Sequence, residues 1–184
     1  MAPEVPERVW VRVLTDGELG AGLRARGWRV GTAESCTGGR VAARLTGTAG
    51  SSDYFAGGIV AYANRVKEAL LGVDAATLAR EGAVSASVAS EMAVGARQRL
   101  GVDVAVATTG IAGPTGGTAD KPVGLVFVAV ATATGVRVRR CQFTGDRAAV
   151  QEAATATALA MVGQVVEAMD EVENVDGASL LVTE

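Results

Sequence analysis

The stretch "VDVAVATTG" at residues 102–110 is apolar almost throughout, and it constrains the fold more than any other part of the chain. A strand with apolar side chains on both faces is buried on both faces, as strands are inside an α/β sheet. The stretches 28–35 and 57–63 are predicted to be two more strands, and helical segments separate the three. We therefore predict an α/β fold, a three-layer α/β/α sandwich with a mixed, mostly parallel sheet.

Helical periodicity and capping residues place the remaining elements. Helices are predicted over residues 15–27, 38–47, 85–100 and 145–169, with a short helical element at 75–85. Thr15 or Asp16 is expected to cap the first of them, and Asn64 is expected to cap a further helix that ends at Gly72. The stretches 123–132 and 136–143 are predicted to form an antiparallel hairpin. The alternating Arg137 and Arg139 in its second strand suit an edge strand with one solvent-exposed face.

Length and composition limit the class of protein. A chain of 184 residues suits a single domain, which we place at 15–170, between an N-terminal extension (1–14) and an acidic tail (171–184). No secretory signal or membrane-spanning stretch is visible, and two cysteines do not make a disulfide framework, so we expect a cytoplasmic protein that meets no membrane. The net charge of −3 and the scattered arginines argue against a nucleic-acid partner.

The chain contains no histidine, which excludes several kinds of active site at once. Ser-His-Asp and Cys-His arrangements and histidine metal sites are ruled out, and two cysteines cannot complete a structural zinc site. Any proton transfer has to use carboxylates, tyrosine, lysine or water. Of the 17 lysines and arginines only Lys67 and Lys121 are lysines. A buried lysine can lose its proton, whereas an arginine keeps its charge.

Three loops at the carboxyl ends of the predicted strands are candidate ligand sites: 34–39, 62–67 and 108–122. In "TAESCTGG", Ser35 and Cys36 precede a predicted helix, whose first N–H groups can bind a phosphate or an oxyanion. A serine at this place is also a common helix cap. Lys67 equally suits a solvated helix face, and the glycine-rich loop equally suits a plain crossover. These alternatives stay open on the residues alone.

Five motifs together resemble the CinA C-terminal domain family, in the order expected for it. They are "ESCTGG", "GGIVAYANRVKEALLGV", "GAVS", "VATTGIAGPTGGTADKPVG" and "FTGDR", and they lie within residues 15–165. Enzymatic members of this family are nicotinamide-nucleotide amidohydrolases, which convert nicotinamide mononucleotide to nicotinate mononucleotide and ammonia in pyridine nucleotide recycling. Larger CinA proteins carry a further N-terminal domain, so the chain is similar to the stand-alone enzyme form.

The resemblance implies a serine–lysine catalytic site. Ser35 matches the nucleophile, Lys67 the base and Tyr62 the tyrosine associated with them. To accept the serine proton near pH 7, Lys67 has to be buried, so that its pKa falls well below the ordinary value of about 10.4. Ser35 then attacks the amide carbon, while N–H groups after Ser35 or in the 109–113 loop hold the oxyanion. Cys36 is the rival nucleophile, and we expect its side chain only to pack.

The same resemblance implies where the substrate binds. The candidate substrate-binding residues are Thr37, Gly38, Gly39, Thr109, Gly110, Gly113, Gly116, Gly117 and Arg147. Family members often have histidine before the aromatic residue ahead of "GDR", where this chain has Gln142, so a histidine role there stays unfilled. The reaction needs no metal and no cofactor.

Two other functions fit the same residues. A non-catalytic nucleotide-binding module, of the kind suggested by family members named for competence or DNA damage, would use the same loops but would need no base. An amidase for another small amide would keep the chemistry and change the substrate. The expected partner is a small nucleotide substrate, and a surface of small residues with periodic helices makes a homodimer reasonable.

Overall fold

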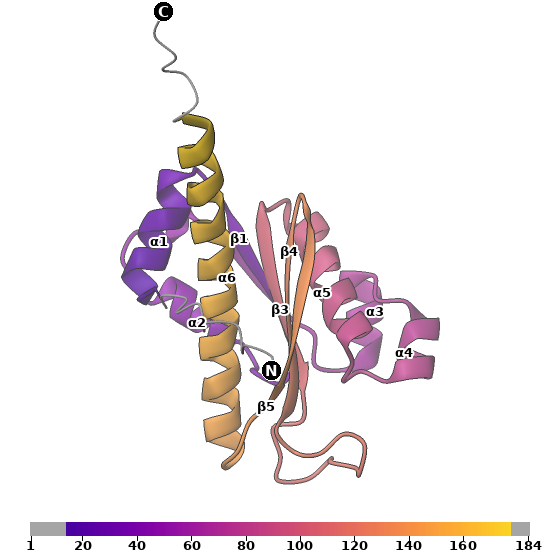
Figure 1. The fold of residues 1–184 in the computed structure, drawn as a ribbon. Coiled ribbons are helices and arrows are strands. Elements are labelled where there is room, and N and C mark those ends of the chain that lie inside the picture. The colour runs from indigo at the N-terminus through magenta and orange to yellow at the C-terminus, as the bar shows by residue number, and fades with distance from the viewer. Residues whose placement is uncertain (1–13, 178–184) are drawn as a thin grey trace, which may run out of the picture.

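The computed structural model describes the backbone of residues 14–177 and the side chains of residues 14–168. Its centre is a five-stranded sheet in the order β2-β1-β3-β4-β5 (Figure 1). The strands are β1 (Val30–Glu34), β2 (Phe55–Val60), β3 (Val104–Gly110), β4 (Leu125–Thr132) and β5 (Gly135–Gln142). The N-terminal extension predicted at 1–14 therefore lies, except for Leu14, outside the described residues.

The sheet is mixed, as predicted, but the expectation that it is mostly parallel is wrong. β1 pairs in parallel with β2 and with β3, whereas β3 with β4 and β4 with β5 are antiparallel. The reason lies in the connection between β3 and β4. A parallel partner needs a crossover that is usually helical, and residues 111–124 contain no helix, so the chain returns antiparallel.

Helices cover both faces of the sheet (Figure 1). They are α1 (Asp16–Ala25), α2 (Arg40–Thr46), α3 (Asn64–Leu71), α4 (Ala75–Glu81), α5 (Ala86–Leu100) and α6 (Arg147–Gly177), with a 3-10 turn at Ser51–Asp53. α1, α2 and α6 pack together on one face, and α5, with α3 and α4 against it, lies on the other. Among the helices of residues 14–177, none combines the length and the apolarity that crossing a bilayer would require.

The two faces of the sheet differ in side-chain size. In β3, Val104 and Val106 belong to the core under α1, α2 and α6, while Ala105 and Ala107 belong to the core under α5. Side chains alternate between the faces of a strand, so the apolar run of β3 supplies both cores. The alanines let α5 approach the sheet closely, which explains why a chain with few aromatic residues still fills its interior.

β5 is the edge strand that the sequence predicts, but both of its faces are exposed. Arg137 and Arg139 share the face of the valines in β4 that point towards α6. Val136 and Val138 lie on the opposite face and are also exposed. The two faces of this strand therefore do not differ as a buried and a solvent-exposed face would, because α5 approaches β5 without covering Val136 and Val138.

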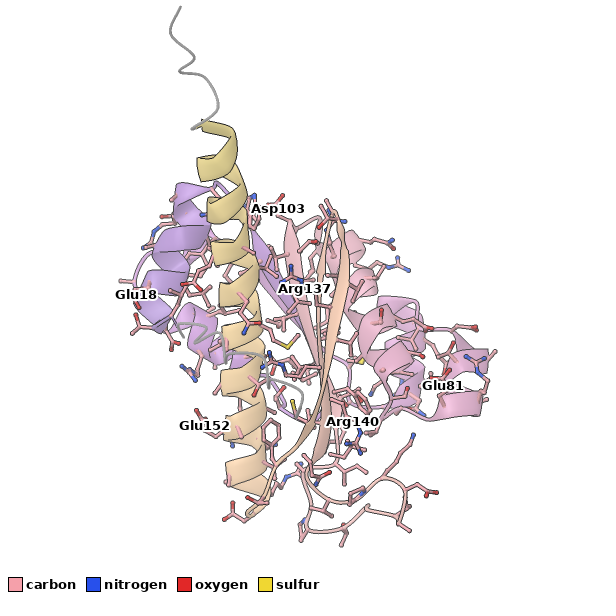
Figure 2. The ribbon with its side chains drawn as sticks, viewed as in Figure 1. Glu18, Glu81, Asp103, Arg137, Arg140 and Glu152 are labelled. Carbon is pink, nitrogen blue, oxygen red and sulfur yellow. The ribbon has the colours of Figure 1, made fainter. Side chains whose placement is uncertain are left out.

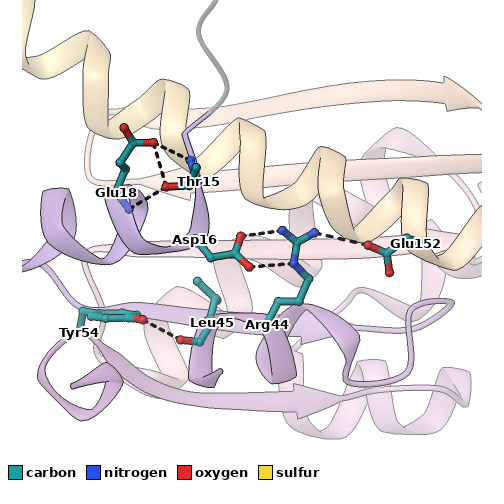
Figure 3. Close-up of polar contacts among 7 residues, drawn as sticks. All are labelled: Thr15, Asp16, Glu18, Arg44, Leu45, Tyr54 and Glu152. Carbon is teal, nitrogen blue, oxygen red and sulfur yellow. Dashed lines mark hydrogen bonds and ion pairs between the residues drawn. The ribbon is translucent and has the colours of Figure 1, made fainter. Parts of the chain in front are cut away.

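The helix boundaries follow the capping chemistry closely. Thr15 caps α1, and its hydroxyl and the Glu18 carboxylate form a reciprocal capping box (Figure 3). The N-cap of α3 is Ala63, so the prediction of Asn64 as the cap is off by one residue. α6 continues to Gly177, into the stretch predicted as an acidic tail, and residues 178–184 of that tail lie outside the described residues.

The last turn of α2 is held against its neighbours by polar contacts (Figure 3). Arg44 of α2 donates to both carboxylate oxygens of Asp16 in α1 and contacts Glu152 in α6. The buried Tyr54 donates its hydroxyl hydrogen to the carbonyl of Leu45 at 2.7 Å. These contacts fix the helix that directly follows the turn of Ser35.

Candidate active site

Ser35 directly follows β1, at the carboxyl edge of the parallel part of the sheet. Its N–H donates to the carbonyl of Thr108 in β3, which ties the residue to the central strand. Ala33 of β1 points into the core under α5, so by alternation the Ser35 side chain lies on the same face, where α3 also packs. Ser35 is 9% exposed, which leaves its hydroxyl at the boundary of the interior.

Lys67 of α3 reaches this hydroxyl from the interior. It is 1% exposed, and its Nζ lies 3.1 Å from Ser35 Oγ. The same Nζ lies 2.7 Å from the carbonyl oxygen of Ala61 and 3.0 Å from that of Tyr62. Burial lowers the pKa of the Lys67 amine, opposed by the nearby Cys36. Among the described residues no carboxylate forms an ion pair with Lys67 that would restore the charge.

The contacts of Nζ are compatible with both protonation states of the amine. An ammonium has three N–H hydrogens, and Ser35 Oγ and the two carbonyls can accept all three. A neutral amine donates its two hydrogens to the carbonyls and leaves its lone pair for the Ser35 hydroxyl. The arrangement therefore brings the predicted nucleophile and the predicted base together, and loss of one proton from Nζ leaves an acceptor facing Ser35.

Glu34, the last residue of β1, places its side chain at the start of α2. Its buried carboxylate accepts from the Thr37 hydroxyl at 2.7 Å, from the N–H of Gly39 at 2.9 Å, and from those of Val41 and Ala42 at 3.1 and 2.8 Å. α2 begins after Gly39, which has no side chain to cap it, and Glu34 supplies the cap instead. The Glu34 carboxylate therefore already balances the partial positive charge of the free N–H groups at the start of α2.

Several donors at the start of α2 already have protein partners. The Thr37 hydroxyl donates to Glu34 and accepts from Thr108, the N–H of Gly38 donates to the carbonyl of Ser35, and the N–H of Gly39 donates to Glu34. Thr37 is also buried. Substrate binding by Thr37, Gly38 and Gly39 stays a prediction, and the N–H of Thr37 is not among the paired donors.

Two N–H groups after Ser35 remain available. The N–H of Thr37 donates to no protein acceptor among the described residues, and that of Cys36 lies beside its own sulfur. Both residues are buried, and buried N–H groups are nearly always paired in folded proteins. The Thr37 N–H is therefore an unpaired donor close to Ser35, and such a donor beside a hydroxyl can hold an oxyanion.

The Cys36 thiol is a poor nucleophile here. The side chain is buried in the core under α6, and burial raises the pKa of the thiol to about 11. At neutral pH the group is therefore a thiol rather than the reactive thiolate. The structure supports the expectation that Cys36 packs.

Arg147 joins α6 to the 111–124 loop and to Tyr62. We call the exposed region around Arg147 and Tyr62 the mouth of the site. Arg147 is the first residue of α6, and its guanidinium donates to the carbonyl of Gly113 at 2.9 Å and to the Tyr62 hydroxyl at 3.0 Å. Tyr62 is 61% exposed, and its backbone carbonyl accepts from Lys67. The structure thus links Arg147 and Tyr62 to the Ser35–Lys67 pair, although the four residues are far apart in the sequence.

The glycine-rich loop at 111–124 stands beside this mouth and is braced by its own contacts. The Thr109 hydroxyl donates to the carbonyl of Ala83, and substrate binding by Thr109 stays a prediction. Lys121 donates to the carbonyl of Glu81 at the end of α4. A Cβ on Gly110 or Gly117 would lie within 3 Å of backbone atoms of the following segment, so these glycines let the loop fold back on itself.

Gly113 and Gly116 remain as loop positions that can meet a ligand. Both have a positive φ, of +81° and +90°, which a side chain would disfavour. A Cβ at Gly113 would meet Val123 of the loop itself, whereas the surroundings of Gly116 are open apart from Ile111. The open side of the loop is thus at Gly116, next to the exposed Gly117.

Sequence reasoning missed two residues that shape the site, Glu34 and Gln151. Glu34 carried a signal, since an acidic residue inside an apolar strand directly before a serine has to find buried donors. No sequence signal pointed to Gln151, because its hydrogen bond to the carbonyl of Cys36 joins residues that only the fold brings together.

A cavity of about 410 Å³ lies elsewhere, at the amino ends of β1 and β3 and beside the β4–β5 turn. Trp28, Asp103 and Arg137 contribute to its lining, and the last two are seen near the end of the sheet away from the 111–124 loop (Figure 2). Ser35 and Lys67 do not line it. The cavity is therefore separate from the candidate active site.

The fold and this pair define an α/β protein with a serine hydroxyl against a buried lysine amine. Residues 15–166 match the family described as the CinA C-terminal domain, and the chain belongs to that family.

Known relatives agree with this assignment. The chain is 50% identical over 159 residues to the nicotinamide-nucleotide amidohydrolase PncC of Escherichia coli K12, covering 82% of this chain and 96% of that protein. It is 52% identical over 147 residues to a CinA-like protein of Salinibacter ruber, covering 80% of this chain. A crystal structure of a CinA superfamily protein from Klebsiella pneumoniae matches with a TM-score of 0.78 at 38% identity, covering 84% of this chain and 99% of that one.

The relatives differ in length. The chain spans 36% of the Salinibacter ruber protein and 40% of a CinA-like protein from Geobacter sulfurreducens. It corresponds to one part of those longer proteins and to nearly the whole of the Escherichia coli amidohydrolase.

Proposed function

We propose that this protein hydrolyses the carboxamide of nicotinamide mononucleotide, giving nicotinate mononucleotide and ammonia. The observation that carries the proposal is the Ser35 hydroxyl 3.1 Å from a buried lysine amine. The name of the Escherichia coli relative, which is similar over nearly its whole length, supports the choice of substrate. A buried base beside a hydroxyl serves acyl transfer, whereas a module that only binds nucleotides has no need of it.

The first step is attack by Ser35. The neutral Lys67 amine accepts the hydroxyl proton as Oγ forms a bond to the carboxamide carbon, and the carbonyl oxygen becomes an oxyanion. The N–H groups of Cys36 and Thr37 are the donors we assign to that oxyanion. The two backbone carbonyls that hold Nζ stabilise the resulting ammonium.

The second half of the reaction returns the enzyme to its starting state. Lys67 gives its proton to the departing nitrogen, the carbon–nitrogen bond breaks, and ammonia leaves an acyl-serine. A water then loses a proton to Lys67 and attacks the same carbon. Cleavage of the Ser35 ester returns the proton to Oγ and releases the acid. Tyr62 lies at the mouth, where its hydroxyl can assist proton transfer to the leaving ammonia.

Substrate binding falls to the mouth of the site. Arg147 contacts Tyr62, whose carbonyl holds Lys67, and its contacts with Tyr62 and Gly113 are exposed or half-buried, so a phosphate can replace them. The open part of the loop at Gly116 and Gly117 can add backbone donors. We place the nucleotide phosphate between Arg147 and this loop.

An amidase for a different small amide is the second candidate, because the serine–lysine pair fixes the chemistry and not the leaving portion of the substrate. The exposed arginine at the mouth favours an anionic substrate over a neutral one. We also propose that the protein forms a homodimer and is located in the cytoplasm.

A coupled ammonia assay with the purified protein tests the function. We expect release of ammonia from nicotinamide mononucleotide by the wild type and none by Ser35→Ala, with the melting temperature of the variant unchanged. Nicotinamide, its riboside and asparagine serve as the substrate panel. Equal turnover by Ser35→Ala would remove the serine mechanism, and turnover of a neutral amide alone would replace the substrate.

A further inference from the structure

The peptide between Cys36 and Thr37 is held from both sides. Its carbonyl, on Cys36, accepts from Nε2 of Gln151 in α6 at 2.8 Å. On the other side, the Thr37 hydroxyl donates to the buried Glu34 carboxylate at 2.7 Å. Neither contact involves Ser35 or Lys67, but both hold the Cys36–Thr37 segment that follows Ser35.

The carbonyl contact fixes the direction of the free N–H. In a trans peptide the C=O and the N–H point in opposite directions, and the Cys36–Thr37 peptide is not among the cis bonds of the chain. Gln151 lies in α6, on one face of the sheet, while Ser35 and Lys67 lie on the face of α3 and α5. An N–H that points away from Gln151 therefore points towards the catalytic face.

The orientation of Gln151 is itself fixed. Its Oε1 accepts from Nε of Arg40 at 3.2 Å, which leaves its NH₂ group for the Cys36 carbonyl. The carboxylate on the other side is held by four donors, as described above. The peptide thus sits in a frame whose parts come from β1, α2 and α6.

We propose that Gln151 is a positioning residue for the oxyanion site: by holding the Cys36 carbonyl it aims the N–H of Thr37 at the oxygen of the attacked amide. The proposal rests on the proposed function in assuming a tetrahedral intermediate on Ser35. A donor held in place before reaction stabilises the transition state more than the bound substrate, so the effect belongs in kcat rather than KM.

Two variants separate the donor from its surroundings. Gln151→Glu keeps an oxygen for Arg40 but cannot donate to the Cys36 carbonyl. Gln151→Met removes donor and acceptor without adding charge. Gln164→Glu, the same change farther along α6, is the matched control. We expect kcat to fall about 10- to 100-fold in both Gln151 variants, with KM within about twofold, an unchanged pH profile and full activity in the control.

Covalent labelling of Ser35 by a small fluorophosphonate gives a readout that does not depend on the natural substrate. The labelled enzyme carries an oxygen in the oxyanion position, so we expect labelling to slow by a similar factor in Gln151→Glu and Gln151→Met. Ser35→Ala should not label at that position. Mass spectrometry of the peptide that contains residue 35 measures the rate.

The outcomes are distinguishable. Wild-type rates of labelling in Gln151→Glu overturn the positioning role, as does a loss that appears in KM or disappears at lower temperature. Impairment of Gln151→Glu without impairment of Gln151→Met points to charge and overturns it too. If the wild type is labelled but does not hydrolyse nicotinamide mononucleotide, the proposed substrate is wrong. The ratio of the labelling rates of wild type and Gln151 variants then tests the positioning role by itself. A wild type that does not label counts against both proposals.

Discussion

The Nζ of Lys67 lies 3.1 Å from the Oγ of Ser35, and its other two partners are backbone carbonyls, those of Ala61 and Tyr62. No carboxylate of the described residues forms an ion pair with the amine. The site therefore lacks the partner that would raise the pKa of Lys67 most strongly. The position of the amine is thus set by the backbone between β2 and α3, and burial lowers its pKa.

Activity should depend on the protonation of Lys67. Because burial lowers the pKa of the amine, we expect kcat/KM to rise with pH through that lowered pKa and to level off while the amine is neutral. Lys67→Arg should be inactive across the range, since a guanidinium stays protonated. A pH–rate profile of the wild type measures the rise. A profile with no acid limb between pH 5 and 9 would contradict Lys67 as the base.

Stability should also respond to this group. With the pKa lowered in the folded state and near about 10.4 in the unfolded state, the unfolded chain binds more protons between the two values, so stability rises with pH in that window. The slope is at most about 1.4 kcal/mol per pH unit. Urea unfolding from pH 7 to 10 should show this rise in the wild type and not in Lys67→Met. Parallel curves for the two proteins would mean that the lysine is not held neutral.

Arg147 should matter for substrate affinity. Arg147→Gln removes the contacts with Tyr62 and Gly113 and the cation beside the mouth, so we expect KM for nicotinamide mononucleotide to rise at least about tenfold, with a smaller change in kcat. Arg139→Gln on the exposed strand β5 is the charge-matched control, with KM unchanged. Steady-state kinetics of the two variants decide this, and equal KM values would place the phosphate elsewhere.

The two cysteines should differ in reactivity. Burial raises the pKa of the Cys36 thiol to about 11, while Cys141 is only partly buried. We expect iodoacetamide at pH 8 to alkylate Cys141 slowly and Cys36 only after unfolding, with no loss of activity on modification of Cys141. Peptide mass spectrometry follows both sites. Rapid alkylation of Cys36 in the folded protein, with inactivation, would favour a cysteine nucleophile.

Gly95 should be intolerant of a side chain. A Cβ there would lie 1.8 Å from the carbonyl oxygen of Leu71, at the end of the helix that carries Lys67. We expect Gly95→Ala to destabilise the protein by at least about 2 kcal/mol. Gly17→Ala is the control, since no atom lies within 4 Å of its Cβ, and we expect it to be neutral or to stabilise by up to about 1 kcal/mol. Thermal unfolding compares the two, and equal effects would contradict the close α3–α5 contact.

Much of the fold was readable because the periodic patterns are strong. The apolar run at 102–110 became the central strand, and the capping residue Thr15 marks the start of α1. The parallel or antiparallel sense of β4 was not readable in the same way, since it depends on whether the loop before it carries a helix. The prediction that β5 has one exposed and one buried face was also wrong, because how far the helices cover this strand depends on how the whole molecule packs.

In the candidate site, the family motifs named Ser35, Lys67, Tyr62 and Arg147, and the structure brings these residues together. The contacts of the Thr37 hydroxyl and the Gly39 N–H with Glu34 could not be predicted, although a buried carboxylate has to find donors, and substrate binding by Thr37 and Gly39 stays a prediction. Glu34 takes the donors of the helix start, and this could not be foreseen without knowing which way each side chain of β1 points.

The order of residues determined the alternating strands and helices, the absence of any histidine base and the choice of a serine followed by glycines, since each is a matter of local pattern or of composition. Only the packed molecule decided the burial of Lys67, which lowers the pKa of its amine, and the partners of Glu34 and Gln151. Burial and contacts between distant segments are properties of the whole arrangement, because the pKa of an amine falls only where the fold removes its solvent.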